Sequence, residues 1–125
     1  MFRKKGFTLL ELIIVIIVIG ILASIALPRY LRVAERSRMA EGKSILGALR
    51  GAQVRYAAEH GNFTTDVDNL DTDMTTSRYF EVPFTVDDTD PIASVVRNAV
   101  DAGSFAYTLT IYEDGTLNCT GTCPE

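Results

Sequence analysis

The sequence has few of the residues on which most enzyme and metal sites depend. It contains one histidine, two cysteines and no tryptophan among 125 residues, whereas most metal centres need three or four good ligands. No serine or cysteine has an identifiable base beside it, and no glycine-rich phosphate loop is present. We therefore predict that the protein is not an enzyme, binds no metal and uses no cofactor.

Net charge is also small, but it is unevenly distributed. Twelve basic and sixteen acidic residues give a net charge of −4, which argues against nucleic acid as the main partner. Residues 29–59 hold seven basic and three acidic residues, a net charge of +4. Residues 60–125 hold two basic and twelve acidic residues, a net charge of −10. The chain therefore has zones that must be interpreted separately.

One long stretch near the amino terminus is almost free of charge. After a basic start at residues 1–6, the only charged residue in 7–28 is Glu11. Residues 12–27 would form about 24 Å of helix at roughly 1.5 Å per residue. Extension back to Phe7 gives about 31 Å, which spans a hydrocarbon core of about 30 Å. We predict a membrane-spanning helix that carries a carboxylate in its first two turns.

Two general explanations of this apolar stretch leave features unexplained. A cleaved secretory signal has an apolar region of about 7–15 residues and a cut site of small residues. Residues 23–26 imitate such a site, but the stretch is too long and contains an acid. An uncleaved signal anchor fits the length and leaves Glu11 without a purpose. Both explanations stay open beside the following one.

The residues Gly6-Phe7-Thr8-Leu9-Leu10-Glu11, followed by an uninterrupted apolar helix, form a specific pattern. The pattern resembles the amino-terminal signal of type IV pilins and of type II secretion pseudopilins. The resemblance implies that a prepilin peptidase removes residues 1–6 by cutting after Gly6, and that Phe7 is then N-methylated. It also implies that residues 7–28 serve first as a transmembrane helix and then as a polymerisation helix.

Elementary electrostatics gives Glu11 a role that agrees with this resemblance. A carboxylate in an apolar segment is tolerable only when it is paired. A cut after Gly6 creates an α-amino group on Phe7. An ammonium and a carboxylate about 4 Å apart attract by about 4 kcal/mol at an effective dielectric constant near 20. We therefore expect the amine of a neighbouring subunit to neutralise Glu11 during assembly.

Basic residues lie on both sides of the apolar stretch, so the positive-inside rule leaves its orientation open. The resemblance implies a single pass through the inner membrane with the head exported. After assembly, the same chain would lie in an extracellular pilus or a periplasmic pseudopilus.

Residues 29–61 are predicted to extend the helix as an amphipathic segment. Pro28 lies where the apolar stretch ends and is expected to bend the helix. Since the family commonly has a helix-loosening proline near this place, the resemblance gives Pro28 a role in assembly. Gly61 is the expected C-terminal cap of a helix from about Phe7 to His60. An amphipathic stripe recurs at spacings of three and four, although Arg38 and Gly42 interrupt its apolar character and its clearest part runs from Ile45 to Tyr56. Its members are Leu31, Ala34, Arg38, Gly42, Ile45, Leu49, Ala52 and Tyr56.

The basic residues of this segment must be either hydrated or paired with acidic groups. They are Arg29, Arg32, Arg36, Lys43, Arg50 and Arg55. We expect them to be solvated, or to meet acids of neighbouring subunits or lipid head groups. A nucleic-acid stripe is the less favoured interpretation.

Residues 62–125 are predicted to form a small β-rich head. Residues 62–77 are interpreted as a loop with at most one short helical turn, and residues 78–86 as a strand broken by proline. Residues 105–112 form the best predicted strand, with a turn at 113–115 and a return at 116–119. Residues 92–102 fit a capped helix or a strand, and resemblance to pilin heads favours the strand. The predicted fold class is therefore α+β and pilin-like, a long helix packed on a small antiparallel sheet.

The two cysteines and the acidic clusters complete the head. In an extended strand Cys119 and Cys123 would lie about 13 Å apart, too far to bond. Gly121 allows the chain to turn, and export would permit oxidation, so we expect a local disulfide. A bridge between subunits stays open. The acids at 66–73 and 87–90 do not match a twelve-residue calcium loop, and we interpret them as solvated surface.

These expectations combine into one predicted function with two alternatives. The prediction is a structural subunit of a type IV pilus-like filament. Its partners would be other copies of itself, prepilin peptidase, the inner-membrane assembly machinery and, before assembly, membrane lipid. A major pseudopilin of a type II secretion system is not separated from it by these residues. A monomeric membrane-anchored binding module is the alternative of another class, and it predicts no filaments and tolerance of Glu11→Ala.

Overall fold

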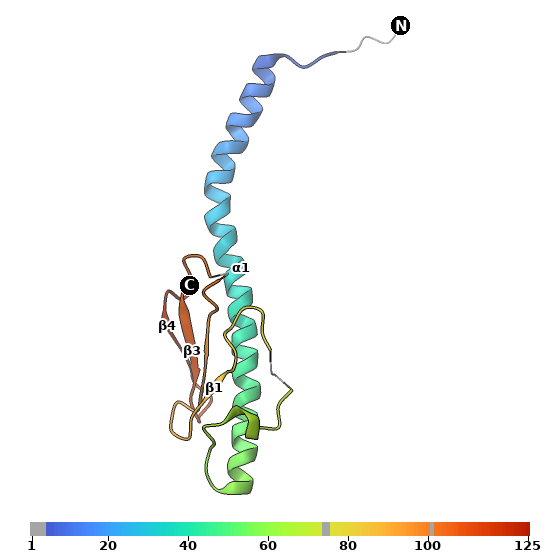
Figure 1. The fold of residues 1–125 in the computed structure, drawn as a ribbon. Coiled ribbons are helices and arrows are strands. Elements are labelled where there is room, and N and C mark those ends of the chain that lie inside the picture. The colour runs from blue at the N-terminus through green and yellow to red at the C-terminus, as the bar shows by residue number, and fades with distance from the viewer. Residues whose placement is uncertain (1–4, 74–75, 101) are drawn as a thin grey trace. The chain divides into compact units, whose positions relative to one another are not determined.

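The computed structural model describes residues 5–73, 76–100 and 102–125. It has an α+β fold, as predicted, and its contacts divide the chain into a first unit, Met1–Ala34, and a second unit, Glu35–Glu125. The elements in chain order are helix α1 (Leu9–His60), 3₁₀-helix η1 (Val67–Asn69) and strands β1 (Thr85–Val86), β2 (Ala93–Val96), β3 (Tyr107–Ile111) and β4 (Leu117–Gly121) (Figure 1).

Helix α1 continues without interruption through Pro28, so the prediction of one long helix is confirmed. It begins at Leu9 rather than at Phe7, because Thr8 caps its first turn. At the other end Gly61 has a φ of 88° and donates its N–H to the carbonyl of Ala57 at 2.8 Å. This left-handed residue is the C-terminal cap that the sequence predicts.

The first unit consists mainly of the apolar part of α1. Fifteen large apolar side chains between Phe7 and Leu27 are exposed. This part of the helix is long and apolar enough to cross a membrane, and none of it is buried inside the chain. The first four residues of the predicted leader lie outside the described residues.

The second unit holds an antiparallel sheet whose strands are neighbours in the order β1-β2-β3-β4. In this register Leu109 of β3 lies opposite Val95 of β2 on one side and Cys119 of β4 on the other. Buried and half-buried residues alternate along β3, as expected when only one face of an antiparallel sheet is covered. A single bridge between Phe80 and Arg97 lies outside the named strands.

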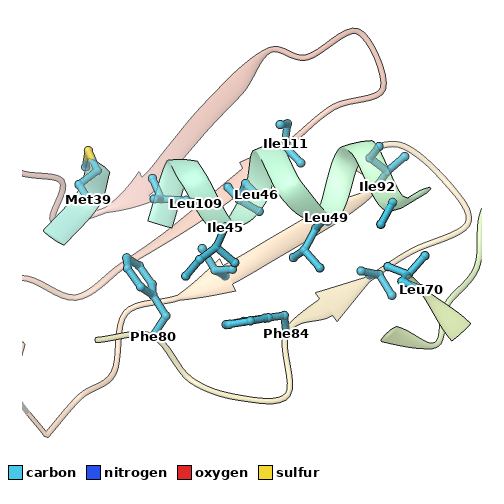
Figure 2. Close-up of a cluster of buried hydrophobic side chains, with 14 of the residues drawn as sticks. Met39, Ile45, Leu46, Leu49, Leu70, Phe80, Phe84, Ile92, Leu109 and Ile111 are labelled. Atoms are coloured by element: carbon cyan, nitrogen blue, oxygen red, sulfur yellow. The ribbon is translucent and has the colours of Figure 1, made fainter. Parts of the chain in front are cut away.

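The hydrophobic core fills the space between the second part of α1 and the inner face of the sheet (Figure 2). Gly42 is a site of close packing, because a Cβ atom there would collide with the rings and methyls of Phe80 and Leu109. The largest buried apolar side chains come from the helix, the loops and the strands: Leu46, Leu49, Phe80, Ile92, Val95 and Leu109.

The buried stripe of α1 differs from the predicted one. Leu31 is exposed, and Arg38 is only partly buried. The buried set also contains polar residues, which an apolar pattern cannot reveal. Its members are Glu35, Met39, Gly42, Ile45, Leu46, Leu49, Ala52 and Gln53.

Most predicted elements of the head are present. Strand β3 and the hairpin to β4 lie where expected, and β2 shows that residues 93–96 form a strand rather than a helix. The predicted loop at 62–77 contains only η1 in its described part. The broken strand at 78–86 is reduced to one bridge and the two residues of β1. Residues 74–75 and 101, which belong to the predicted loop and to the segment 92–102, lie outside the described residues.

Candidate functional site

The predicted cleavage position lies in accessible, non-helical chain. Gly6 and Phe7 precede α1, and both are exposed. The Phe7 side chain is 86% exposed. A peptide bond in this position is available to an enzyme without unfolding of the helix that follows it.

Glu11 forms a reciprocal capping box with Thr8 at the start of α1. The Thr8 backbone N–H donates to Glu11 Oε2 at 3.1 Å, and the Glu11 backbone N–H donates to Thr8 Oγ1 at 3.2 Å. The Thr8 hydroxyl also donates to Glu11 Oε2 at 3.2 Å. Two helix N–H groups that would otherwise lack partners are satisfied in this way.

The capping box leaves part of the Glu11 carboxylate available. Both bonds that reach this side chain end on Oε2, and no donor among the described residues reaches Oε1. A carboxylate accepts more than two hydrogen bonds when it is ionised. Glu11 can therefore cap its own helix and still receive a donor from outside the chain.

Pro28 lies inside α1 and removes one backbone donor from it. Because proline has no N–H, the carbonyl of Ser24 lacks its usual partner four residues later. The Ser24 hydroxyl donates to the carbonyl of Ile21 at 2.7 Å and does not replace the missing bond to the Ser24 carbonyl. The helix therefore has a local weakness at Pro28, and the role of Pro28 in assembly stays a prediction.

A buried ion pair joins α1 to the sheet in the second unit. Glu35 of α1 is 1% exposed, and Arg97, directly after β2, is 2% exposed. Arg97 donates from Nε to Glu35 Oε1 and from Nη2 to Glu35 Oε2 at 3.4 Å. The Tyr107 hydroxyl of β3 donates to Oε1 at 3.1 Å, and Arg38 Nη1 donates to Oε2 at 3.0 Å. This cluster ties three elements together through one carboxylate.

The cluster favours the ionised carboxylate. Burial by itself would raise the pKa of Glu35, but the hydrogen bonds from Arg97, Arg38 and Tyr107 and the Arg97 charge hold that pKa below its usual value of 4.5. Burial, together with the neighbouring Glu35 charge, raises the pKa of Tyr107. Glu35 is therefore charged and Tyr107 neutral at neutral pH.

Gln53 forms a second buried polar junction. Its Nε2 atom donates to the carbonyls of Thr64 at 2.8 Å and Asp87 at 3.0 Å, and its Oε1 atom accepts from the Thr64 N–H at 3.0 Å. The side chain has no exposed surface. Gln53 therefore fixes two loops of the head to α1.

The predicted local disulfide between Cys119 and Cys123 is present, and their Cα atoms are 6.3 Å apart. The chain turns at Gly121, whose φ is 99°. A Cβ atom on Gly121 would collide with the Ala106 carbonyl oxygen. The turn therefore depends on glycine, as the spacing of the two cysteines suggests.

The structure brings together some of the predicted site residues and adds others. The cysteines are bonded, and Glu11 is joined to Thr8, which the sequence interpretation did not single out. The signal was present, because Thr-x-x-Glu before an apolar run is typical of a capping box. Glu35 and Gln53 had no local signal, since a polar residue on a helix is usually solvated. Among the described residues, no group of three metal-ligating side chains occurs.

The fold and the N-terminal segment together define a class: pilin-like α+β proteins, in which an uncovered apolar helix precedes a small antiparallel sheet. Comparison with known proteins agrees with this class. Residues 1–27 match the family model described as the prokaryotic N-terminal methylation motif.

Three relatives are similar over about half of this chain. They are fimbrial protein EcpC of Eikenella corrodens, 48% identical over 63 residues, type IV major pilin protein PilA of Myxococcus xanthus, 44% identical over 62 residues, and type IV major pilin protein PilE of Neisseria gonorrhoeae, 40% identical over 63 residues. The matched segments cover 50% of this chain in each case, and 41%, 28% and 38% of the respective relatives. The motif and these relatives agree with the resemblance to type IV pilins, and the chain spans less than half the length of each of these relatives.

Proposed function

We propose that this chain is the structural subunit of a type IV pilus-like filament. In this proposal prepilin peptidase cuts after Gly6, Phe7 is N-methylated, and the helix at residues 7–28 holds the subunit in the inner membrane. Assembly machinery then transfers the subunit into a helical polymer. The match to the methylation motif and the similarity to fimbrial proteins and type IV major pilins support this proposal.

The observation that carries the proposal is the uncovered apolar surface between Phe7 and Leu27. A helix that is apolar on every side is stable only when lipid or other protein surrounds it. Lipid satisfies this need before assembly. In a polymer, the same surfaces of neighbouring copies would cover one another, and apolar burial would stabilise the filament.

Glu11 supplies specificity that apolar packing lacks. Its Oε2 atom is engaged by Thr8, so Oε1 is the atom offered to a neighbour. Cleavage after Gly6 would provide a suitable donor, the α-amino group of Phe7 of the incoming copy. A pair of opposite charges in an apolar surrounding favours one register of packing over others.

The proposal is tested by measuring how much of the Glu11→Ala variant is in the membrane fraction and how much is in filaments sheared off the cell surface. We expect this variant to be inserted in the membrane and cut like the wild type, but to be depleted from filaments sheared off the cell surface. Ser24→Ala is the matched control, because it removes a polar side chain of the same helix that bonds only within its own turn. Both fractions are quantified by immunoblot against the head.

Two outcomes would contradict the proposal. Recovery of Glu11→Ala in sheared filaments at the wild-type level would remove the assembly role of Glu11. A wild-type chain found only as a membrane-bound monomer would favour the tethered binding module instead.

A further inference from the structure

The exposed side of α1 in the second unit carries basic residues at heptad spacing. Arg36, Lys43 and Arg50 are seven residues apart. Seven residues make almost two turns of an α-helix, so these side chains lie within about 40° of one another around the axis. Arg36 and Lys43 are exposed, and no ion pair to either is present among the described residues. We call Arg36 and Lys43 the basic row.

Arg50, the third residue at this spacing, shows what such a side chain can bind. Its Nε atom donates to the carbonyl of Glu113 at 2.9 Å, in the turn between β3 and β4. Hydrogen bonds from Thr116 hold the pKa of Asp114 below its usual value, and the charge of Arg50 adds to this effect. Within one chain, this side of α1 therefore already meets the acidic turn.

The acidic turn is part of a larger group of exposed carboxylates. The Glu113 N–H donates to Asp90 Oδ1 at 2.8 Å, which joins the turn to the loop before β2. None of these carboxylates forms an ion pair among the described residues. We call this group the acidic patch: Asp87, Asp88, Asp90, Glu113 and Asp114.

We propose that the basic row of one copy binds the acidic patch of a second copy. The inference rests on the proposed function, because only a polymer places many copies of the chain side by side. Opposite charges at an interface favour the correct partner and register, whereas like charges are repelled. The small exposed residues Ala40 and Gly47 flank Lys43 and leave room for a loop to approach the helix.

The spacing also suggests how the copies are related. A parallel copy displaced along the helix axis by seven residues moves by about 10.5 Å, at roughly 1.5 Å per residue. Its acidic patch would then lie level with Lys43, as the patch of the first copy lies level with Arg50. A displacement of fourteen residues would place a patch level with Arg36.

The chain offers a direct test, since Lys43 is the only lysine between residues 7 and 125. A carbodiimide activates a carboxylate, and an amine in contact attacks it, which forms an amide and converts the carbodiimide to a urea. No acid lies three or four residues from Lys43 on α1, so a link within the helix is not expected. In sheared filaments we expect covalent multimers in which Lys43 is joined to a peptide that contains residues 87–90 or 113–114.

The controls separate this contact from other reactions. Lys43→Arg keeps the charge and removes the amine, so it should polymerise normally and lose the link to the patch. Monomeric chains in detergent should give no Lys43-linked dimer. The variant that combines Arg36→Glu and Lys43→Glu should reduce filament yield roughly tenfold, because it places like charges together. Arg78→Glu, an exposed charge reversal outside the row, should not.

The outcomes separate this inference from the proposed function. Wild-type filaments without a Lys43 link to the acidic patch overturn the inference alone, as does normal polymerisation of the double charge reversal. Lys43 linked to carboxylates outside the patch overturns it as well. An absence of any wild-type polymer overturns the proposed function, and the inference falls with it.

Discussion

At the scale of single residues, the stability of the second unit depends on a buried charged residue and on a tightly packed glycine. Glu35 is a carboxylate with almost no exposed surface, and it is held by two arginines and a tyrosine. Gly42 has no side chain, and the atoms of Phe80 occupy the space that a methyl group would need. Each of these residues therefore tolerates little change.

The first prediction concerns Glu35→Gln. Removal of one partner of a buried ion pair costs about 3–5 kcal/mol, because the other charge is left buried and unpaired. We expect such a loss at neutral pH in denaturant unfolding of the detergent-solubilised chain, followed by tyrosine circular dichroism. Glu59→Gln, on the exposed end of the same helix, is the control and should change stability little.

The pH dependence of this loss follows from the lowered pKa of Glu35. A carboxyl group whose pKa is lower in the folded state stabilises the fold above its unfolded pKa, and that stabilisation is lost as pH falls through the folded pKa. The stability difference between the wild type and Glu35→Gln should therefore narrow below about pH 4.5. A difference that stays constant into strong acid would contradict the assignment of the charge.

The second prediction compares two glycines of one helix. Gly42→Ala should destabilise the head by about 1–3 kcal/mol, since the added methyl group overpacks the core against Phe80 and Leu109. Gly47→Ala meets nothing within 4 Å and should stabilise the helix by up to about 1 kcal/mol. Thermal unfolding of both variants measures whether stability falls for Gly42→Ala and rises for Gly47→Ala. The same change in stability for both variants would refute the close packing at Gly42.

At the scale of elements, local residue patterns correctly predicted strand β3, its hairpin and the long helix. The run of β-branched and aromatic residues fixed the position of β3, and the Glu-Asp-Gly turn fixed its hairpin. Strand β1 has only two residues, and it exists because β2 lies beside it, which no local pattern contains. The capping box was visible as Thr-x-x-Glu at the start of the apolar run.

The buried stripe of α1 shows why its buried polar residues could not be predicted from the sequence. Positions 35, 39, 42, 46, 49 and 53 follow a regular 4-3 spacing, but the two ends of the stripe are Glu35 and Gln53. Their partners are far away in the sequence, at Arg97 and in the loops at Thr64 and Asp87. A polar side chain is buried only where such partners exist, so its burial is a property of the folded head.

The third prediction concerns the end of the sheet. Replacement of Cys119 and Cys123 by serine should destabilise the head by about 2 kcal/mol, the entropy expected for a loop of this size. The loss should be local, with faster amide hydrogen exchange in β4 and little change in β2. Equal acceleration in both strands would show that the disulfide supports the whole sheet rather than its edge.

At the scale of the whole molecule, the two units differ in how their apolar side chains are covered. The first unit presents apolar side chains that its own chain does not cover. The second unit has its own core, a buried ion pair and a disulfide. The proposed function accounts for this difference, because a pilus subunit would need an apolar helix that lipid covers first and other copies of the chain cover later.

The intact mass and the amino-terminal sequence of the chain, measured in sheared surface filaments and in membranes, test directly whether the protein is a processed pilus subunit. We expect the filament fraction to contain a chain that begins at Phe7 and whose mass is that of residues 7–125 with one added N-methyl group. The membrane fraction should contain the same processed chain together with its uncut precursor. A chain that retains Met1, occurs only in membranes and never enters a polymer would show that the protein is not a pilus subunit.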